Sequence, residues 1–427
     1  MRHFPHRVVV PVVALVVALV APAHAAKQAA PPAPVSPVLA HNLGAQAEER
    51  LQEVVDRFNK QNGTTLTVQR LEKGAKPATL NLIRRSEVGD VFSQPKSFIP
   101  LHQMLSGAGQ KLSLTDISRD LKAGVVDRQG RLVALPLVYS TPVLFYNKNA
   151  FRKAGLDPER PPVTWFEMQG VLDKLQGAGY SCPYTSSWPV WVHVDNVSAL
   201  SGVPATTDKG QLSFNGLPQV KHIAMMATWT KAGYFQLFGR RDEASGKFNE
   251  GECAMITTDS REHADFKEAK GVELGVTALP HHDDVYGGRR STLADGASLW
   301  IGAGRSKAEY KVAAKFVSFI LSPEIQLEIV RRHGGLPLTA AARAASRSQL
   351  LRDDDRTLDV AFASLKGEGS KTDMRVANIE PLLVIANEEL EAVWADRKPA
   401  KAALDTSVSR GNGVLQARPA LKKVQPF

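Results

Sequence analysis

The sequence predicts an α/β protein with two lobes, each a sheet covered by helices. From residue 36 onward, apolar runs of strand length alternate with amphipathic helical stretches, which is the pattern of βαβ units. The chain has 427 residues, too many for one hydrophobic core. Hydrophobic residues make up 43% and charged residues 22%, as in an ordinary globular protein. Together these observations indicate a globular α/β protein divided into two large lobes.

The N-terminus predicts secretion. Arg2 and Arg7 precede the apolar run Val8–Val20, which is too short to cross a bilayer because a spanning helix takes about 20 residues. A small-x-small cleavage signal follows at Ala23-His24-Ala25. These features are typical of a signal peptide over residues 1–25, and the Ala- and Pro-rich residues 26–37 read as a flexible lead-in. The alternative is a buried hydrophobic helix, which rarely begins so close to an N-terminus.

The first part of the chain shows helical spacing of apolar residues in some stretches and short apolar runs of strand length in others. Leu51, Val54 and Phe58 recur at helical spacing, and Asn62-Gly63 is a typical helix end. Short apolar runs between polar residues predict strands. The elements expected here are a strand over 36–40, a helix around 51–58, a strand over 66–71, a helix from Pro77 to Ile83 and a strand over 90–92.

The same alternation continues to the C-terminus. Thr164 follows Pro161-Pro162 and is a good N-cap for the helix Trp165–Gly177. The other expected helices cover 149–154, 219–232 and 310–321, with a late helix beginning at 388–394. The expected strands cover 131–136, 143–146, 253–257 and 297–302.

Charge and motifs narrow the function classes. The formal net charge is +10, but the Lys and Arg residues are scattered, which argues against nucleic-acid binding. The sequence has no G-x-S-x-G, P-loop, H-E-x-x-H or C-x-x-C motif, so we expect no catalysis and no cofactor. The run His281–Asp284 is metal-like, but adjacent side chains point apart, so we interpret it as a solvated loop. A secreted hydrolase with paired carboxylates stays an alternative, although nothing singles out such a pair.

The two cysteines, Cys182 and Cys253, are a candidate disulfide. An even number of cysteines in an oxidising compartment favours pairing. The alternative is two separate buried thiols, because the sequence does not show whether their Cβ atoms are close. We favour the disulfide.

The chain resembles a known family from residue 140 onward. Ser140–Lys148 reads S-T-P-V-L-F-Y-N-K, and F-R-K-A-G-L-D-P follows at 151–158. This stretch resembles the ABC solute-binding proteins of the maltose-binding-like cluster. Later segments are similar to the glycerol-3-phosphate-binding proteins of that cluster: Cys182-Pro183-Tyr184, Trp188-x-x-Trp191, Gly251–Met255 and Gly296–Trp300. The resemblance covers nearly the whole mature chain and is strongest from about 130 to 412.

The resemblance implies a fold, a location and a partner. It implies two Rossmann-like α/β lobes with a hinge and an interlobe cleft, the class II topology of periplasmic binding proteins. Such a protein works in the periplasm as a monomer and delivers its solute to ABC permease subunits in the inner membrane. Its expected divisions are 38–147 plus about 297–340 for lobe 1, 148–296 plus about 341–415 for lobe 2, and a basic tail over 416–427.

Several residues are candidates for ligand binding. The spacing of Trp188 and Trp191, with Pro189 in a first turn, predicts two indoles on one helix face that cover a glycerol chain. Two core tryptophans are the alternative. By resemblance, the ligand-contacting positions are Ser140, Trp188, Ser260, Gly296 and Arg375.

Each of these residue types suits an anionic ligand. Arg375 offers a bidentate fork for a phosphate, and a surface salt bridge is its alternative role. Gly296 has no Cβ, so the N–H groups of Gly296 and Ala297 can approach a ligand closely.

Two departures from the family pattern bear on the ligand. Lys76 stands where the family has a binding Tyr, and Gly335 replaces a second Tyr. The paired loss leaves space, so we expect sn-glycerol-3-phosphate or a larger relative such as a glycerophosphodiester. The alternative is a sugar-binding protein of the same fold, with the tryptophans stacked on a sugar.

Overall fold

The computed structural model divides the chain at residue 35, and residues 36–427 form one compact unit. The predicted signal peptide, the predicted strand over 90–92 and Arg375 lie outside the described residues. The residues that the structure describes are 1, 36–43, 45–72, 74–84, 87–88, 94–110, 112, 114, 116–117, 121–122, 125–127, 129–207, 209–284, 291–350, 355–365 and 380–417.

The first lobe is built on a mixed sheet with the order β2-β1-β3-β11-β4, in which β5 also pairs with β11. Its first three strands are parallel, and β11 runs antiparallel to β3, β4 and β5. The strands are β1 (Val38–His41), β2 (Thr67–Arg70), β3 (Leu80–Arg84), β4 (Phe98–Ile99), β5 (Leu135–Ser140) and β11 (Asp295–Gly302). A late segment of the chain therefore completes the sheet that the N-terminal segment begins.

The helices of the first lobe pack against this sheet with an apolar face. In α1, Val55 and Phe58 are fully buried, and Phe58 meets the ring of Phe316 from α10 edge to face at 5.1 Å. The helices are α1 (Ala45–Asn62), α3 (Leu101–Gly107), α10 (Lys307–Ile320), α11 (Pro323–His333) and α12 (Ala340–Leu350), with the short 3-10 turn η2 (Pro95–Ser97).

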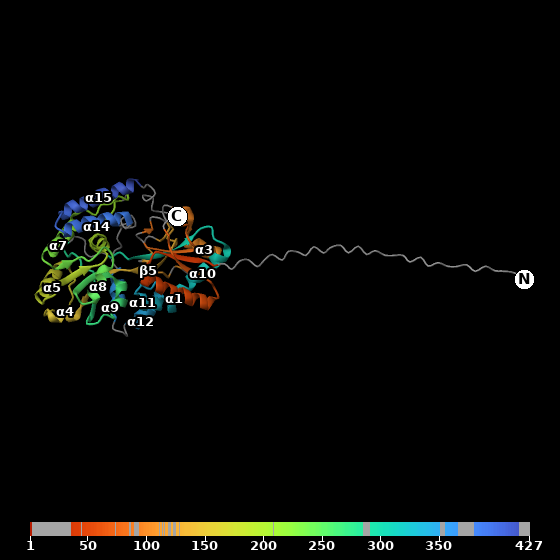
Figure 1. Cartoon of the computed structure of the whole chain (residues 1–427), viewed down its shortest axis with the longest axis horizontal. Helices are drawn as coiled ribbons and strands as arrows, with labels where there is room; N and C mark the ends of the chain where they lie inside the picture. The colour runs from red at the N-terminus through yellow and green to blue at the C-terminus, as the bar shows by residue number, and fades with distance from the viewer. Residues whose placement is uncertain are drawn as a thin grey trace. The chain divides into compact units, whose positions relative to one another are not determined.

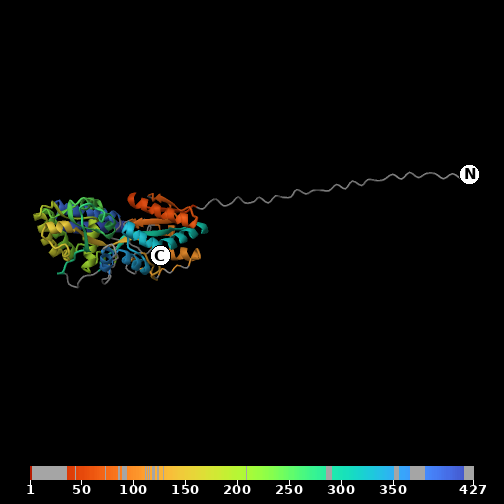
Figure 2. The same cartoon turned by 90° about the horizontal axis from the view of Figure 1, so that it is seen from below.

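The second lobe is built on a sheet with the order β10-β6-β9-β7-β8. Strands β7, β8 and β9 are parallel, and β6 runs antiparallel to β9 and β10. The strands are β6 (Pro142–Asn147), β7 (Cys182–Ser186), β8 (Phe235–Gln236), β9 (Cys253–Asp259) and β10 (Leu274–Ala278). Figures 1 and 2 show the two sheets in separate halves of the compact unit.

The helices of the second lobe surround this sheet, and α14 and α15 pack on each other and on α7 (Figure 1). Helix α5 begins with a capping box: the Thr164 hydroxyl accepts from the Glu167 N–H, and the Glu167 carboxylate accepts from the Thr164 N–H. This confirms the predicted N-cap. The helices are α4 (Lys148–Lys153), α5 (Trp165–Gly177), α6 (Val197–Leu200), α7 (Leu217–Lys231), α8 (Glu243–Asn249), α9 (His263–Phe266), α13 (Thr357–Ser364), α14 (Glu380–Trp394) and α15 (Ala400–Ala417).

The structure differs from the sequence-based expectation at three places. The strand expected over 131–136 begins later, because β5 covers Leu135–Ser140. The predicted helix from Pro77 to Ile83 is wrong, because Leu80–Arg84 is the central strand β3. The change of sheet falls at Thr141, between β5 and β6, which is one strand earlier than the expected lobe boundary after Asn147. Strand β6 therefore belongs to the sheet of the second lobe.

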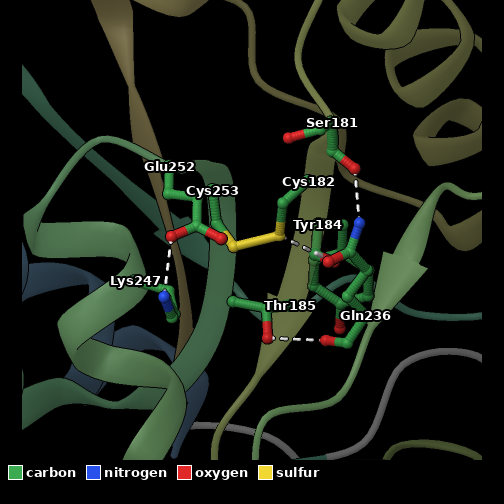
Figure 3. The surroundings of a disulfide bond; sticks show 8 residues. All are labelled: Ser181, Cys182, Tyr184, Thr185, Gln236, Lys247, Glu252 and Cys253. Atoms are coloured by element: carbon green, nitrogen blue, oxygen red, sulfur yellow. Dashed lines mark hydrogen bonds and ion pairs between the residues drawn. A yellow bond between two sulfur atoms is a disulfide. The ribbon is translucent and has the colours of Figure 1, made fainter.

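Cys182 and Cys253 form a disulfide with a Cα–Cα distance of 4.5 Å (Figure 3). The two cysteines are direct partners in the parallel pairing of β7 with β9, and both are fully buried. The Gln236 side chain donates to the Ser181 carbonyl at 2.5 Å, and the Thr185 hydroxyl donates to the Gln236 carbonyl at 2.8 Å. The bond thus links two strands at the ends where they enter the sheet.

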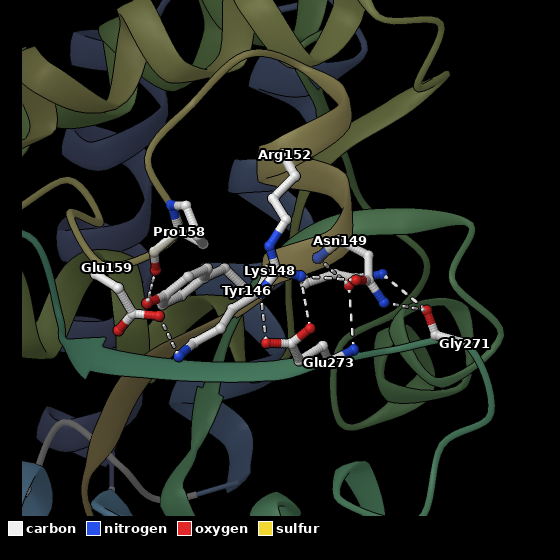
Figure 4. A network of polar contacts seen from close by, with 9 residues as sticks. Tyr146, Lys148, Asn149, Arg152, Pro158, Glu159, Gly271 and Glu273 are labelled. Carbon is white, nitrogen blue, oxygen red and sulfur yellow. Dashed lines mark hydrogen bonds and ion pairs between the residues drawn. The ribbon is translucent and has the colours of Figure 1, made fainter.

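A polar network covers the junction of β6 and α4 (Figure 4). Arg152 forms a two-armed ion pair with Glu273 at 2.6 and 2.7 Å, and both side chains are about half exposed. The Asn147 side chain caps α4 by accepting from the Asn149 N–H at 3.0 Å. The Arg152–Glu273 ion pair lies on the surface, whereas Asn147 is buried. Among the described residues, no helix is long and apolar enough to cross a membrane.

Candidate functional site

A cavity of about 480 Å³ is lined by residues from both lobes. From the first lobe, Arg84 lies at the end of β3, Ser140 at the end of β5, and Gly296 in β11. From the second lobe, Trp188 and Arg261 follow strands β7 and β9. The cavity therefore lies where strand ends of the two sheets meet, in agreement with the expected interlobe cleft.

Both predicted tryptophans line the cavity, but not from one helix face. Trp188 precedes the helix and has a left-handed φ of 53°, while Trp191 begins the π-helical segment η4 (Trp191–Asn196). The helix-face prediction is therefore wrong for Trp188. The backbone N–H of Trp188 donates to the Arg241 carbonyl at 2.8 Å, and the Trp188 carbonyl accepts from the Val192 N–H at 3.0 Å. These two bonds hold a conformation that L-residues rarely adopt.

The indole N–H groups of Trp188 and Trp191 are buried, and neither meets a hydrogen-bond partner in the part of the chain that the structure describes. Trp191 is 7% exposed, so its ring is largely covered by protein. A buried donor without a partner is costly unless a ligand or water satisfies it. Both residues line the cavity, so their rings contribute apolar area to it, while their N–H groups are covered by protein.

Gly296 is required by strand pairing. A Cβ at this position would lie 1.8 Å from the Val138 carbonyl oxygen of the neighbouring strand β5. The Gly296 N–H donates to Asp295 Oδ1 at 2.7 Å, so it is satisfied within the chain. The sequence predicted close approach of a ligand to this backbone, whereas the structure shows close approach of another strand. Ala297 also lines the cavity and is almost fully buried.

The other predicted residues have different positions. Ser140 lines the cavity, but Ser260 does not: the Ser260 hydroxyl accepts from the Thr141 N–H at 3.3 Å. Lys76 is exposed and lies outside the cavity lining. Arg375 lies outside the described residues. Gly335 does not line the cavity either, so the space expected from its missing side chain is not part of this cavity.

No sequence motif predicted the arginines that line the cavity. They are Arg50, Arg84, Arg240, Arg241 and Arg261. Three of them belong to the short basic pairs Arg84-Arg85 and Arg240-Arg241. Arg84 is the last residue of β3, and Arg240 and Arg241 come after β8. A pair of arginines near a strand end is a local sequence signal for a site residue. The sequence around Arg50 and Arg261 contains no such signal.

Within the described part of the chain, carboxylates pair with four of these five arginines. Arg240 binds Glu391 through two bonds of 2.6 and 2.8 Å. The other pairs are Arg50 with Asp265 at 2.9 Å, Arg241 with Glu380 at 3.5 Å and Arg261 with Asp259 at 2.5 Å. Burial lowers the pKa of Arg261, but the Asp259 carboxylate outweighs it, and the net pKa is raised. Arg261 is therefore a fixed cation.

Arg84 has a different electrostatic environment. Burial lowers its pKa most, and the neighbouring cations Arg261 and Arg241 lower it further, against Glu87 and Asp242. We call Arg84, Arg241 and Arg261 the arginine cluster. Because it combines side chains from both lobes in one cavity, the cluster is suited to bind an anion between the lobes.

A second polar group lies inside the second lobe and does not line the cavity. His193 Nδ1 is 3.0 Å from His222 Nε2, and His222 Nδ1 is 3.1 Å from His282 Nε2. We call these three residues the histidine chain. Burial lowers the pKa of His193 to about 3 and that of His282 to about 4. The solvated-loop interpretation holds for Asp283 and Asp284, which are exposed, but is wrong for His282, which points into the lobe.

Comparisons with known proteins agree with this architecture. The family model of bacterial extracellular solute-binding proteins matches residues 53–354. The sn-glycerol-3-phosphate-binding periplasmic protein UgpB of Pectobacterium atrosepticum is 33% identical over 401 residues, covering 88% of this chain and 90% of that protein. The UgpB of Salmonella typhimurium is also 33% identical, over 403 residues, with 88% and 91% covered.

Solved structures share the fold at lower identity. UgpB from Mycobacterium tuberculosis in complex with glycerophosphocholine has a TM-score of 0.74 at 20% identity, covering 90% of this chain and 100% of that one. Maltose-bound T. maritima MalE3 has a TM-score of 0.71 at 17% identity, covering 89% and 100%. The chain therefore belongs to the bacterial extracellular solute-binding proteins and is a periplasmic solute-binding protein of ABC importers, of the UgpB and MalE type.

Proposed function

We propose that this protein captures sn-glycerol-3-phosphate or a related glycerophosphodiester in the periplasm and delivers it to an ABC permease. One observation carries the proposal: a single interlobe cavity combines two indoles with the arginine cluster. The indoles suit an apolar glycerol backbone, and the arginines suit a phosphate. The relatives named above for sn-glycerol-3-phosphate support the same ligand class.

The mechanism is closure of the two lobes around the solute. Closure places the anion among fixed donors in a medium of low dielectric, where each charge-assisted hydrogen bond is stronger than in water. Trp188 and Trp191 cover the carbon skeleton of the ligand with their rings. Ser140 adds a hydroxyl from the first lobe. Arg375, Ser260 and Lys76 stay predictions from the sequence.

The size of the cavity favours the larger ligand. At about 480 Å³ it lies within the usual range of small-molecule sites, about 300–1,000 Å³, and exceeds what a glycerol phosphate fills. A glycerophosphodiester has the same anionic centre and an additional headgroup. The cavity is also lined by Asp242 and Asp295, whose carboxylates suit a cationic headgroup.

A ligand panel tests the proposal. We expect sn-glycerol-3-phosphate and glycerophosphocholine to raise the melting temperature of the purified protein, and maltose to leave it unchanged. A ligand at one hundred times its dissociation constant stabilises the folded state by about 2.7 kcal/mol. Stabilisation by maltose alone would favour the sugar-binding alternative, which the paired tryptophans also suit. Hydrolysis of glycerophosphocholine, followed by phosphorus NMR, would favour the hydrolase alternative.

A further inference from the structure

The end of helix α11 in the first lobe lies directly against the second lobe. Helix α11 ends at His333, and Gly334 follows with a left-handed φ of 64°. A Cβ on Gly334 would lie 2.3 Å from the carbonyl oxygen of Arg261 and 2.5 Å from its Cα. Arg261 belongs to the 3-10 turn η5 (Ser260–Glu262), directly after β9 of the second lobe. Because carbon and oxygen normally approach to about 3.3 Å, only glycine lets the two lobes meet here.

An ion pair crosses the same boundary between the lobes. Arg50 in α1 of the first lobe donates to Asp265 in α9 of the second lobe at 2.9 Å. The two side chains are 26% and 35% exposed, so solvent screens the pair and its contribution to stability is small. Helix α9 directly follows η5 and also contacts α11. Two helices of the first lobe therefore meet one short segment of the second lobe, residues 260–266.

We infer that the Gly334–Arg261 backbone contact and the Arg50–Asp265 ion pair form a latch, which holds part of the ligand-free population in the closed arrangement. Its role rests on the proposed function, in which the lobes close around the solute. Gly334 does not line the cavity, so its contact acts through the position of the lobes and not through the ligand. Affinity rises with the closed fraction, because only the closed form surrounds the solute.

Substitution of Gly334 tests the steric part of the latch. Gly334→Ala adds the Cβ that the Arg261 backbone excludes, so we expect a larger radius of gyration for the ligand-free protein in small-angle X-ray scattering. In isothermal titration calorimetry, we expect the dissociation constant for sn-glycerol-3-phosphate to rise by about tenfold or more, because the closed fraction falls.

The matched control is Gly155→Ala. Gly155 follows α4 with the same φ of 64°, but no described atom beyond its chain neighbours would lie within 4 Å of a Cβ there. This variant carries the same backbone strain without the contact between the lobes. It should keep the wild-type radius and change the dissociation constant by less than about twofold.

Melting temperatures separate closure from folding. A left-handed φ strains alanine at either position, so both alanine variants should melt lower than the wild type by similar amounts. Gly334→Asn covers the case in which Gly334→Ala does not fold, because asparagine tolerates the left-handed region but still carries a Cβ. We expect the same increase in radius and the same loss of affinity from it. Wild-type radius and affinity in a folded Gly334 variant would overturn the inference.

The direction of the change in Asp265→Asn tests the ion pair. Arg50 and Asp265 both line the cavity. If the Asp265 carboxylate acted directly on an anionic ligand, its removal would strengthen binding of sn-glycerol-3-phosphate. The latch predicts the opposite, a dissociation constant higher by about two- to fivefold, as for the loss of a partly exposed ion pair. Equal or tighter binding would overturn the role of the ion pair.

Failure of the latch and failure of the proposed function give different results. If the wild type binds sn-glycerol-3-phosphate and glycerophosphocholine no better than maltose, the proposed function fails. The scattering comparison of the ligand-free proteins still tests the latch in that case, and equal radii in wild type and Gly334→Ala would overturn it. If the wild type binds these ligands and Gly334→Ala binds them equally well, the latch fails and the proposed function stands.

Discussion

The histidine chain and the arginine cluster are two polar regions that treat charge in opposite ways. Each member of the histidine chain contacts another member at hydrogen-bond distance, and burial favours their neutral forms. The arginine cluster stays charged, faces a cavity and brings like charges together. A polar group that is satisfied within the protein supports the fold, whereas one that faces a cavity is available to a ligand. Changes to the first region should alter stability, and changes to the second should alter affinity.

The largest effect should come from lowering the pH. Because the pKa values of His193 and His282 are lowered to about 3 and about 4, the unfolded chain binds protons first as the pH falls. Above about pH 6.5 these histidines are neutral in both the folded and the unfolded chain, so they do not reduce stability. As the pH falls toward 4, they protonate in the unfolded chain, and the free energy of unfolding decreases. From pH 7.5 to pH 5, each should lower the free energy of unfolding by about 2 kcal/mol, and the two together by about 4 kcal/mol.

Urea unfolding at both pH values measures this loss. The matched variant is His282→Gln, in which a neutral amide replaces the outermost member of the histidine chain and one titrating group is removed. We expect its pH-dependent loss to be smaller than that of the wild type by about 2 kcal/mol. An equal loss in both proteins would mean that the histidine chain does not set the acid sensitivity.

Removal of the disulfide should have the next largest effect. The bond closes a loop with a sequence separation of 71, so replacing Cys182 and Cys253 with Ser should lower the free energy of unfolding by about 3 kcal/mol. The cysteines do not line the cavity, so the dissociation constant at 25 °C should change less than about threefold. Chemical denaturation and calorimetry check the two numbers. A large loss of affinity would show that the two regions are coupled.

Truncation of an indole should have the smallest effect on energy, and it should appear in affinity. We expect Trp188→Ala to weaken binding of glycerophosphocholine by about 2 kcal/mol, the typical loss for a buried aromatic anchor. The ligand-free protein should lose about 1 kcal/mol or less. The control Phe166→Ala removes an aromatic side chain that is 82% exposed, and it should leave affinity unchanged. If Trp188→Ala destabilised the protein but bound normally, the ring would be part of the core.

The sequence predicted most of the fold because its patterns are local. The spacing in α1 and the N-cap at Thr164 depend on near neighbours, and the structure confirms both. The strand Leu80–Arg84 was mistaken for a helix because Leu80 and Leu82 are buried on one face and Asn81 and Ile83 on the other. A strand buried on both faces shows no alternation, so its pattern does not separate it from a buried helix.

The site was predictable only in part. Resemblance supplied Trp188 and Ser140, and the structure places both at the cavity. The left-handed backbone of Trp188 is set by bonds to Arg241 and Val192, which spacing alone does not reveal. The arginine cluster comes from separate segments of the chain, which line one cavity only after folding. The sequence therefore shows the wall of the site better than its charge.

The disulfide between β7 and β9 also makes the stability of the protein depend on its cellular compartment. Cytoplasmic reductants keep cysteine thiols reduced, whereas the oxidising periplasm allows the disulfide to form. A precursor in the cytoplasm therefore lacks this disulfide in the second lobe, which carries Trp188 and Trp191. The chain is easier to keep unfolded for secretion and harder to unfold after it arrives. The disulfide thus makes the binding protein most resistant to unfolding in the compartment where it binds its solute.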